Sequence, residues 1–548
     1  MHRIGPLITA KPANVILILT DDQSDAFSST DLQHQPKLIK HIKSQGATIK
    51  NSFATTPVCC PSRSSIYTGK YIHNIGVHNN RAGSGNCASL DWQSGPERDN
   101  VAHYLSSLLS VKTSFSGKYL NNYGFGSNDG SVFQLPQCMN ITNAREKAGM
   151  DNTCASTVEH VPRGWDNWQA LVGNSCYYNY TLSNNGVKEK HGDDYGKDYL
   201  IDLVKNRSLS FIESQSSLSS PFFVTMSVPS AHEPADPAPQ YASYGSGLKA
   251  PRTPNYNWVD EGSGRHWMVD QVNIEGKGFN ETVESFVDLL YRRRLATLQS
   301  VDDLIEEVVD RLAELGELDN TYIIYTSDNG YHLGQFGVPI DKRQPYESDL
   351  RVPMFVRGPG IKKNVTIDNS YALNIDLAPT ILDMSGLSQA TISGLGFDGE
   401  SLLPLLTTGS TGRSKSFLVE YNGENVDGCW AYLENDFALN HAFSLYDGIN
   451  CGLRGPESFK TEPKWEGEET FSTIQDSSNN TYKCVREIGG DYYGDDGGTG
   501  DFQFCEWDSG EREAFDLKMD YWQMNNLVKD MTEEEIEEWH QKLVALRR

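Results

Sequence analysis

The residues with the strongest chemical signal lie in one short stretch, residues 59–69, which reads Cys-Cys-Pro-Ser-Arg-Ser-Ser-Ile-Tyr-Thr-Gly. Pro61 suits the first turn of a helix, where its missing N–H is not needed, and Gly69 suits the end of one. Cys59 then begins the helix, where the helix N-terminus lowers the pKa of a thiol and attracts anions. Arg63 lies one turn further on and points back toward it. The spacing predicts a reactive cysteine beside an anion site; the alternative is a structural disulfide at Cys59.

Carboxylate and amide side chains follow two of the apolar runs that we expect to be buried strands. The run at residues 14–20 ends in an Asp pair, and the run at 322–326 is followed by Ser-Asp-Asn-Gly. In open α/β sheets, ligands bind beyond the carboxyl ends of the strands. Adjacent carboxylates need a cation, a proton or a basic partner, and hard oxygen ligands suit Ca²⁺ or Mg²⁺ rather than zinc or copper. The candidate metal ligands are Asp21, Asp22, Asp328 and Asn329.

Basic side chains that could bind an oxyanion occur at four separate positions. Arg63 lies in the stretch described above, Lys118 follows an apolar run, and Lys342 lies in a polar loop. His232 follows the apolar run 221–228 and stands between two prolines, which hold it rigidly outside a helix. A single His of this kind is more often a hydrogen-bonded surface residue, so its role depends on the other three. Together the four residues predict a local positive cluster.

The apolar pattern predicts an α/β fold, in which buried strands alternate with amphipathic helices. Continuous apolar runs of strand length are typical of strands that are covered on both faces in a mainly parallel sheet. We therefore expect a large, mostly parallel mixed sheet sandwiched by helices. The predicted strands are 14–20, 47–53, one that ends within 115–121, 221–228, 322–326 and 353–357. The predicted helices are 38–44, 59–69, 101–109, 199–214, 286–312 and 375–384.

The last quarter of the chain has a different pattern. Beyond a polar region near 399–411, short runs with turn signals between them predict a smaller C-terminal antiparallel sheet. A terminal helix is expected at 531–547, with a capping box made by Thr532 and Glu535. The short strands are expected at 417–421, 430–434, 443–446, 482–485 and 502–505. The two predicted domains are 1–405, the catalytic α/β domain, and 406–548, the antiparallel subdomain with its terminal helix.

Cysteine usage and glycosylation motifs indicate an oxidising, secretory or lysosomal setting. The ten cysteines form neither a Cys-x-x-Cys motif nor the paired Cys/His spacing of a zinc site. Residues 122–195 are rich in Gly, Asn and Cys and lack periodicity, so we expect a disulfide-linked excursion that lines the cleft and does not build the sheet. Residues 1–10 are too short and mixed for a complete signal peptide. Asn-x-Ser/Thr tripeptides occur at Asn140, Asn179, Asn206, Asn280, Asn364 and Asn479.

Net charge and hydropathy argue against two kinds of partner. The chain has 548 residues, with 47 basic and 73 acidic side chains and a net charge of -26. Such a surface repels nucleic acid and anionic membranes. No apolar run approaches the roughly 20 residues of a membrane-spanning helix. An anionic substrate therefore has to be attracted by a local basic cluster.

These motifs together resemble those of the type I sulfatases, which belong to the alkaline-phosphatase-like superfamily. The resemblance spans the chain and rests on residues 14–22, 59–69, 117–118, 232, 326–330, 341–342 and 351–353. Within the family, residues 117–121, 341–347, 480–483 and 515–517 are similar to the branch of glucosamine-6-sulfatases and fungal or algal arylsulfatases. One position departs from the family pattern, because many sulfatases have His two residues after the first Lys, where this chain has Leu120.

The resemblance implies a role for each candidate residue. A formylglycine-generating enzyme would oxidise Cys59 to formylglycine, and Ca²⁺, or else Mg²⁺, would be bound beside it. The implied metal ligands are Asp21, Asp22, Cys59, Asp328 and Asn329, and the implied sulfate-binding and acid residues are Arg63, Lys118, His232 and Lys342. His73 and His332 are candidate walls of the substrate pocket, and each is equally compatible with an ordinary surface or core position. With Cys59 modified, nine cysteines remain, and Cys60 is expected to stay unpaired.

The implied activity is the hydrolysis of sulfate monoesters, either aryl sulfates or sulfated sugars. An oxygen of the aldehyde hydrate would attack sulfur in line, and the second hydroxyl would later expel sulfate. His232 or Lys342 would protonate the departing ester oxygen. A phosphomonoesterase or phosphodiesterase of the same superfamily is one alternative, since sulfate and phosphate are nearly isosteric. A non-catalytic binding protein that retains the fold is another.

Overall fold

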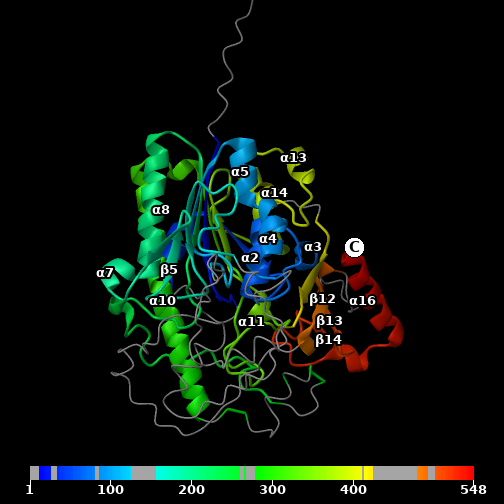
Figure 1. Ribbon diagram of the computed structural model, residues 1–548. Helices are drawn as coiled ribbons and strands as arrows, with labels where there is room; N and C mark the ends of the chain where they lie inside the picture. The colour runs from blue at the N-terminus through cyan, green and yellow to red at the C-terminus, as the bar shows by residue number, and fades with distance from the viewer. Residues whose placement is uncertain are drawn as a thin grey trace, which may run out of the picture.

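Two separate sheets organise the chain in the computed structural model, which describes residues 12–25, 34–80, 86–124, 156–259, 264–266, 269, 278–279, 281–409, 413–423, 478–490 and 500–547. The larger sheet has ten strands in the order β10-β2-β9-β8-β1-β7-β3-β4-β5-β6, and the smaller has four in the order β11-β12-β13-β14. Figure 1 shows the larger sheet in the centre of the molecule, with helices on both sides, and the smaller sheet beside the C-terminus. The predicted fold class is confirmed.

The centre of the large sheet is parallel. Strand β1 (Asn14–Thr20) lies between β7 (Phe222–Ser227) and β8 (Thr321–Ser327), and β7 pairs with β3 (Lys112–Lys118). Antiparallel pairs occur where β9 meets β8 and β2, and where β5 meets β4 and β6. The other strands are β2 (Ala47–Phe53), β4 (Asn167–Leu171), β5 (Thr181–Asn184), β6 (Val187–Lys190), β9 (Met354–Arg357) and β10 (Val365–Leu373).

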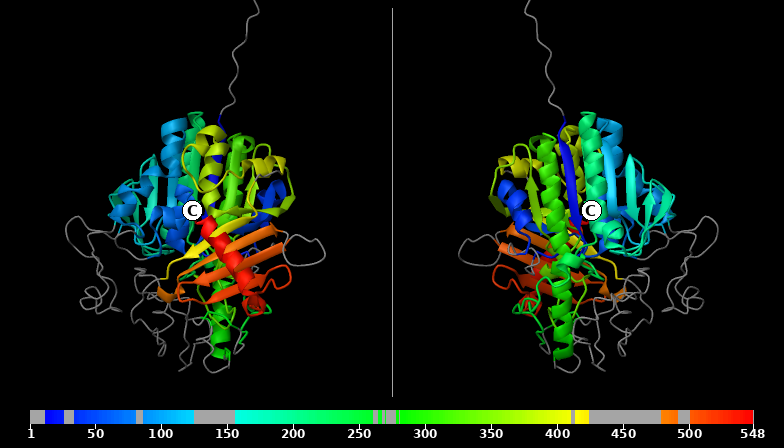
Figure 2. Two further views of the ribbon diagram at one scale, coloured as in Figure 1. Left: turned by 90° about the vertical axis from the view of Figure 1, so that its right-hand side faces the viewer. Right: turned by 90° about the vertical axis from the view of Figure 1, so that its left-hand side faces the viewer.

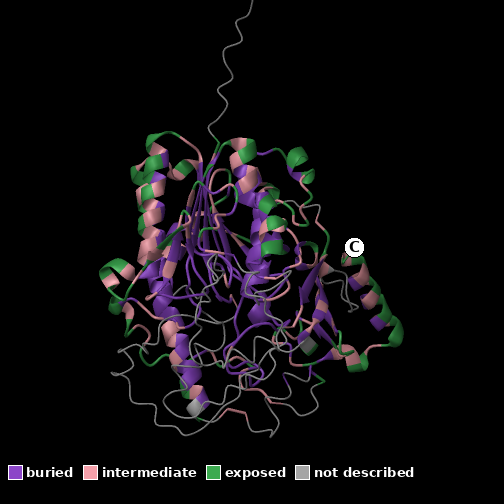
Figure 3. Cartoon of the chain, viewed as in Figure 1, coloured by how far each residue is buried: buried purple, intermediate pink, exposed green. Residues whose placement is uncertain are grey.

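The residues of β1 alternate between two hydrophobic cores, one on each face of the sheet. Val15, Leu17 and Leu19 pack into the core that contains helices α2 (Cys59–Thr68), α5 (Val101–Leu109) and α12 (Leu377–Met384). Ile16 and Ile18 pack into the core that contains α8 (Leu200–Ser217) and α10 (Glu281–Glu314). Figure 3 shows the central strands buried between helices whose outer faces are exposed. A strand covered on both faces needs a continuous apolar run, which is what the sequence has.

Apart from α16 (Glu533–Leu546) at the C-terminal end, the remaining described α-helices are short. They are α1 (Pro36–His41), α3 (Ile72–Ile75), α4 (Leu90–Ser94), α7 (Tyr195–Asp198), α11 (Glu347–Leu350), α13 (Gln389–Ser393) and α14 (Leu403–Thr408). Among the described residues, no helix combines the length and the apolar character needed to cross a bilayer.

The small sheet is antiparallel throughout and is covered on both faces. Its strands are β11 (Ser416–Tyr421), β12 (Tyr482–Gly490), β13 (Gly500–Trp507) and β14 (Arg512–Asp516). The terminal helix α16 packs across the outer face (Figure 2). Its Trp539 stacks on the rings of Phe502 and Phe504. The capping box of Thr532 and Glu535 is confirmed. The inner face joins one core with Phe53, Leu350 and Leu373 of the large unit, so the two sheets are packed together.

The structure corrects part of the prediction for residues 122–195. They were expected to leave the sheet, yet β4, β5 and β6 extend it by three strands. These strands are short, and β6 lies exposed at the edge, so they lack the apolar run that marks a central strand. Strands β10 and β14 were also missed. The strands expected at 430–434 and 443–446 lie outside the described residues, and the division at 405/406 stays a prediction.

The cysteines pair differently from the prediction. Cys60, expected to stay unpaired, forms a disulfide with Cys87, and Cys484 forms one with Cys505. Within the described part of the chain, Cys59 is the free cysteine, and it is buried. The prediction for Cys60 was wrong because spacing does not fix connectivity when ten cysteines are present.

Candidate functional site

Four neighbouring parallel strands bring the predicted site residues to one edge of the large sheet. Strand β1 pairs in parallel with β7 and β8, and β7 pairs in parallel with β3. Because these strands run in one direction, their carboxyl ends meet. The residues placed there are Asp21 and Asp22 after β1, Asp328 and Asn329 after β8, His232 after β7, and Lys118 at the end of β3.

Helix α2 carries the predicted nucleophile and the predicted arginine. It begins at Cys59 and ends at Gly69, whose φ of 66° is left-handed and whose N–H donates to the carbonyl of Ser65. A Cβ at Gly69 would lie 2.6 Å from the ring of Phe397, so both the turn and the packing require glycine here. All ten residues of α2 are buried. The helix therefore faces the core and the site, with its N-terminal end among the strand ends.

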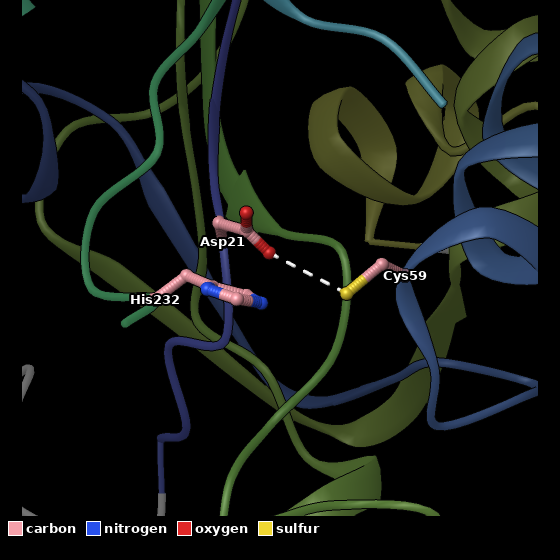
Figure 4. A group of neighbouring side chains, drawn as sticks. All are labelled: Asp21, Cys59 and His232. Atoms are coloured by element: carbon pink, nitrogen blue, oxygen red, sulfur yellow. Dashed lines mark hydrogen bonds between the residues drawn. The ribbon is translucent and has the colours of Figure 1, made fainter. Parts of the chain in front are cut away.

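The thiol of Cys59 points into the carboxylate cluster. Its Sγ lies 3.7 Å from Oδ1 of Asp21 and 3.9 Å from Oδ1 of Asp22, and Figure 4 shows the imidazole of His232 on the same side. Burial raises the pKa of the Cys59 thiol, although Lys118 lowers it. The thiol pKa is thus raised and not lowered as predicted, because desolvation, together with the nearby Asp21 and Asp22, outweighs the two lysines.

The carboxylates and the amide form an oxygen-rich cluster. Asp21, Asp22 and Asp328 are fully buried, and each has a carboxylate oxygen within 4.8 Å of the other two. Asn329 donates from Nδ2 to Oδ1 of Asp22 at 2.7 Å, while its own buried Oδ1 has no hydrogen-bond partner among the described residues. A buried oxygen without a donor is a position that a cation can satisfy. This donor set fits a hard divalent ion such as Ca²⁺ or Mg²⁺.

Three fixed cations pair with the three carboxylates one to one. All six side chains are almost completely buried, so the charges are desolvated and each needs its partner. The three ion pairs by themselves carry no net charge, so a bound divalent cation would leave a positive excess that attracts an anion. The pairs are Lys118 Nζ with Asp21 Oδ2 at 2.6 Å, Lys342 Nζ with Asp22 Oδ2 at 2.7 Å, and Arg63 Nε with Asp328 Oδ2 at 2.7 Å.

Two of the carboxylates, Asp328 and Asp21, have pKa values shifted in opposite directions. Burial raises the pKa of Asp328, with Arg63 opposing and Asp21 adding to the rise. Burial by itself would raise the pKa of Asp21 as well. The charges of Lys118 and His232 outweigh this effect and hold the pKa of that carboxyl well below its ordinary value. Like charges this close favour keeping one proton in the cluster unless a cation replaces it.

The imidazole of His232 has a defined orientation. Its Nδ1 lies 2.6 Å from the backbone carbonyl oxygen of Glu233, and since a carbonyl accepts, Nδ1 carries a hydrogen. Its Nε2 lies 3.8 Å from Oδ2 of Asp22. Burial and Lys342 lower the pKa of His232, but Asp21 and Asp22 raise it well above its ordinary value. These carboxylates favour the protonated ring, and its Nε2 faces them, in a position from which a proton could be donated.

Ser175 is a site residue that the sequence analysis missed. Its hydroxyl donates to Oδ2 of Asp21, the oxygen that also binds Lys118. The residue lies in the region 122–195, where no pattern separates it from its neighbours. Sequence alone carries no signal for it.

Arg294 was missed as well, although the sequence contains a signal for it. It donates from Nη1 to the carbonyl of Ala231 at 3.0 Å and from Nη2 to the carbonyl of Asp22. Asp22 has a left-handed φ of 61°, so its backbone needs such support. Arg294 lies four residues from both Leu290 and Leu298, in the middle of the apolar stripe of α10. A charged residue in such a stripe indicates a buried polar partner.

The two predicted substrate-pocket histidines have other partners. His73 is half-buried, with Nδ1 2.6 Å from Oε1 of Glu420 on β11. His332 is buried, with Nδ1 3.0 Å from Oδ1 of Asp349, and its Nε2 has no hydrogen-bond partner in the described part of the chain. A role in substrate binding stays a prediction for both.

Known protein families match most of this chain. The Sulfatase family profile matches residues 13–387, and a profile described as "N-sulphoglucosamine sulphohydrolase, C-terminal" matches residues 334–445. The chain belongs to the sulfatase family and is a sulfuric ester hydrolase.

Individual relatives agree with this assignment. Human N-acetylglucosamine-6-sulfatase is 39% identical over 544 residues, a match that covers 98% of this chain and 85% of the human protein. A putative extracellular sulfatase Sulf-1 homolog of Caenorhabditis elegans is 42% identical, covering 72% of this chain and 49% of its own length. A structure solved in complex with its substrate D-glucosamine-2-N,6-O-disulfate superposes with a TM-score of 0.66, covering 98% of this chain and 97% of that one. It is 19% identical, so this likeness supports the fold.

Proposed function

We propose that this enzyme removes sulfate from O6 of N-acetylglucosamine or a closely related sulfated glucosamine, using a formylglycine made from Cys59 and a bound Ca²⁺, with Mg²⁺ as the alternative ion. The observation that carries the chemistry is the position of Cys59, whose Sγ lies 3.7 Å and 3.9 Å from two buried carboxylates. The choice of sugar rests on the human relative, which is named for this substrate.

The proposed modification supplies what a thiol lacks. A thiol that attacked a sulfate ester would form a stable thiosulfate, whereas an aldehyde hydrate supplies an oxygen nucleophile and a second hydroxyl that lets sulfate leave. A formylglycine-generating enzyme is the implied partner in maturation.

The metal would be held by the cluster at the strand ends. The proposed ligands are Asp21, Asp22, Asp328, Asn329 and the modified residue 59. When bound, the cation would polarise the sulfate oxygens and acidify a hydroxyl that touches it. The orphaned Oδ1 of Asn329 supports this assignment.

The basic residues would act on the sulfate and on the leaving group. Arg63, Lys118 and Lys342 are fixed by buried ion pairs, so they would stabilise negative charge on the sulfuryl oxygens without having to reorganise. His232 presents Nε2–H and is the proposed donor to the departing ester oxygen, with Lys342 as the alternative. A positioned proton donor typically contributes about 10²–10⁴-fold.

A secreted or lysosomal/vacuolar location is proposed for the enzyme. Two disulfides, Cys60–Cys87 and Cys484–Cys505, support an oxidising environment. Three of the glycosylation motifs have exposed asparagines, at Asn206, Asn364 and Asn479. Such positions are open to an attached glycan.

A substrate panel tests the proposal. It contains N-acetylglucosamine 6-sulfate, sugars sulfated at other positions, 4-nitrophenyl sulfate and 4-nitrophenyl phosphate. The highest kcat/KM is expected on the 6-sulfated glucosamine, and the aryl sulfate should be cleaved faster than the aryl phosphate. Preference for phosphate would favour a phosphoesterase, and preference for another sulfated position would remove the substrate assignment.

A further inference from the structure

The small antiparallel sheet binds the backbone of the loop that carries Lys342. Asn480 donates from Nδ2 to the carbonyl oxygen of Arg343 at 3.2 Å, and Tyr482 donates from its hydroxyl to the same oxygen at 3.1 Å. A carbonyl oxygen has two lone pairs, so these two donors satisfy it completely. We refer to Asn480 and Tyr482 as the carbonyl clamp.

The Lys342 loop has a backbone that needs such support. The residues on either side of Lys342 have left-handed conformations, with φ of 130° at Asp341 and 86° at Arg343. Residues with a Cβ adopt these conformations only when the surroundings hold them there. The N–H of Arg343 is bound by the carbonyl of Pro57 at 3.1 Å, just before the start of α2. The backbone of Arg343 is thus hydrogen-bonded on both sides: its carbonyl oxygen to the clamp and its N–H to Pro57.

The clamp itself is held rigidly. Asn480 and Tyr482 have no exposed surface, and Trp507 donates from Nε1 to Oδ1 of Asn480 at 3.3 Å. That bond fixes which end of the amide faces Arg343. Two residues beyond Tyr482, the Cys484–Cys505 disulfide joins the paired strands β12 and β13. The donors therefore have few alternative positions.

The same face of the small sheet continues to bind this segment beyond Arg343. Gln503 donates from Nε2 to the carbonyl of Pro345 at 2.5 Å, and Arg486 lies 3.2 Å from a carboxylate oxygen of Glu347. Alternate residues at 343, 345 and 347 are thus bound by the inner face of the sheet. The small sheet therefore binds this segment at several successive positions and not through one isolated hydrogen bond.

We propose that Asn480 and Tyr482 are positioning residues for the reaction, which act by holding Lys342 at the carboxylate of Asp22. The small sheet then belongs to the catalytic centre through the loop that carries Lys342. The inference rests on the proposed function, in which Lys342 acts on the sulfate ester. It also accounts for the motif at 480–483, because Asn480 and Tyr482 face Arg343 while Lys483 faces the other way, toward Asp508.

A double-mutant cycle with Lys342 tests this inference. Tyr482→Phe removes one hydroxyl, and Asn480→Leu removes the amide while keeping the Asn-x-Thr motif at 479–481. Each is made in the full-length, Ca²⁺-loaded protein, with and without Lys342→Gln, and kcat is measured on 4-nitrophenyl sulfate. Each clamp variant should lower kcat about tenfold when Lys342 is present. In the Lys342→Gln background the same change should cost less than about twofold.

Lys483→Gln is the matched control, since it changes the neighbouring side chain on the opposite face of β12. It should leave kcat within about twofold, and thermal unfolding should show that all variants are folded. Equal losses in both backgrounds, or no loss in either, would overturn the clamp while leaving the sulfatase assignment intact. Failure of the proposed function would instead appear as a parent enzyme that cleaves no sulfate ester.

Discussion

The two sheets contribute to the site by different physical means. The large sheet presents charged side chains at the carboxyl ends of its parallel strands, with three buried ion pairs and an oxygen-rich cluster. The small sheet holds the backbone of the loop that carries Lys342 with two neutral donors, Asn480 just before β12 and Tyr482 on β12, a strand that a disulfide joins to β13. Residues on the large sheet can therefore take part in the reaction, whereas those on the small sheet can only fix positions. Changes in the first should abolish turnover, and changes in the second should reduce it or affect only stability.

The largest effect is expected when the proposed nucleophile is changed, at the N-terminus of helix α2 beside the carboxyl ends of the large sheet. Cys59→Ser keeps the size of the side chain but is expected to prevent formation of the aldehyde, so kcat/KM on 4-nitrophenyl sulfate should fall about 10⁴-fold or more. The thermal unfolding midpoint of the variant should stay close to that of the parent. Activity within tenfold of the parent would show that residue 59 is not the nucleophile.

Removal of the metal should have the next largest effect. A chelator of both Ca²⁺ and Mg²⁺, such as EDTA, should lower kcat at least about 100-fold, because the proposed cation would stabilise charge on the sulfate. It should also lower the thermal midpoint, since a cation that binds the folded state stabilises that state relative to the unfolded chain. Adding Ca²⁺ back should restore both, and chelator saturated with Ca²⁺ beforehand is the control. Full activity after exhaustive chelation would contradict the metal assignment.

A smaller effect is expected from a change of Arg294, which binds the backbone carbonyl of Asp22, one of the proposed metal ligands. Arg294→Met leaves the carbonyls of Ala231 and Asp22 without their donor, and kcat should fall about 10–100-fold while KM changes little.

The matched control for Arg294 lies on the same helix. Arg292 donates to the carbonyl of Leu248 instead of to the site, so Arg292→Met should keep kcat within about twofold of the parent. A loss in Arg292→Met as large as that in Arg294→Met would assign the effect to helix stability.

The smallest effect is expected on the outer side of the small sheet. Thr532 is the N-cap of α16, and its hydroxyl accepts from the N–H of Glu535 at 3.3 Å. Thr532→Ala removes this cap. The free energy of unfolding should fall by about 1 kcal/mol, as measured by urea denaturation, while kcat stays within about twofold. A clear fall in kcat would contradict the division of roles between the two faces of this sheet.

The charged part of the site could be predicted from sequence because each piece of it is local. Asp21 and Asp328 each follow directly after a buried strand. Cys59 lies in a stretch whose own residues indicate where the helix begins and ends. The fold rules for parallel strands then place these pieces together. The hairpin of β5 and β6 was missed despite the Asn185-Gly186 pair at its turn. Their φ values of 50° and 84° suit the primed turns that such pairs favour.

The supporting part of the site could not be predicted in this way. Asn480 and Arg343 are 137 positions apart in the sequence, and the residues around each of them give no indication that the two are in contact. Ser175 lies in a region without periodicity, and Cys60 finds Cys87 among many possible partners. Such contacts depend on how distant elements pack, and the sequence pattern of a single element does not contain that information.

The most direct test of this account is the chemical state of residue 59 in active enzyme. Peptide mass spectrometry after proteolysis should find formylglycine at position 59, in a fraction that rises in proportion to specific activity across preparations. A fully active preparation that carries an unmodified cysteine thiol at this position would contradict the account.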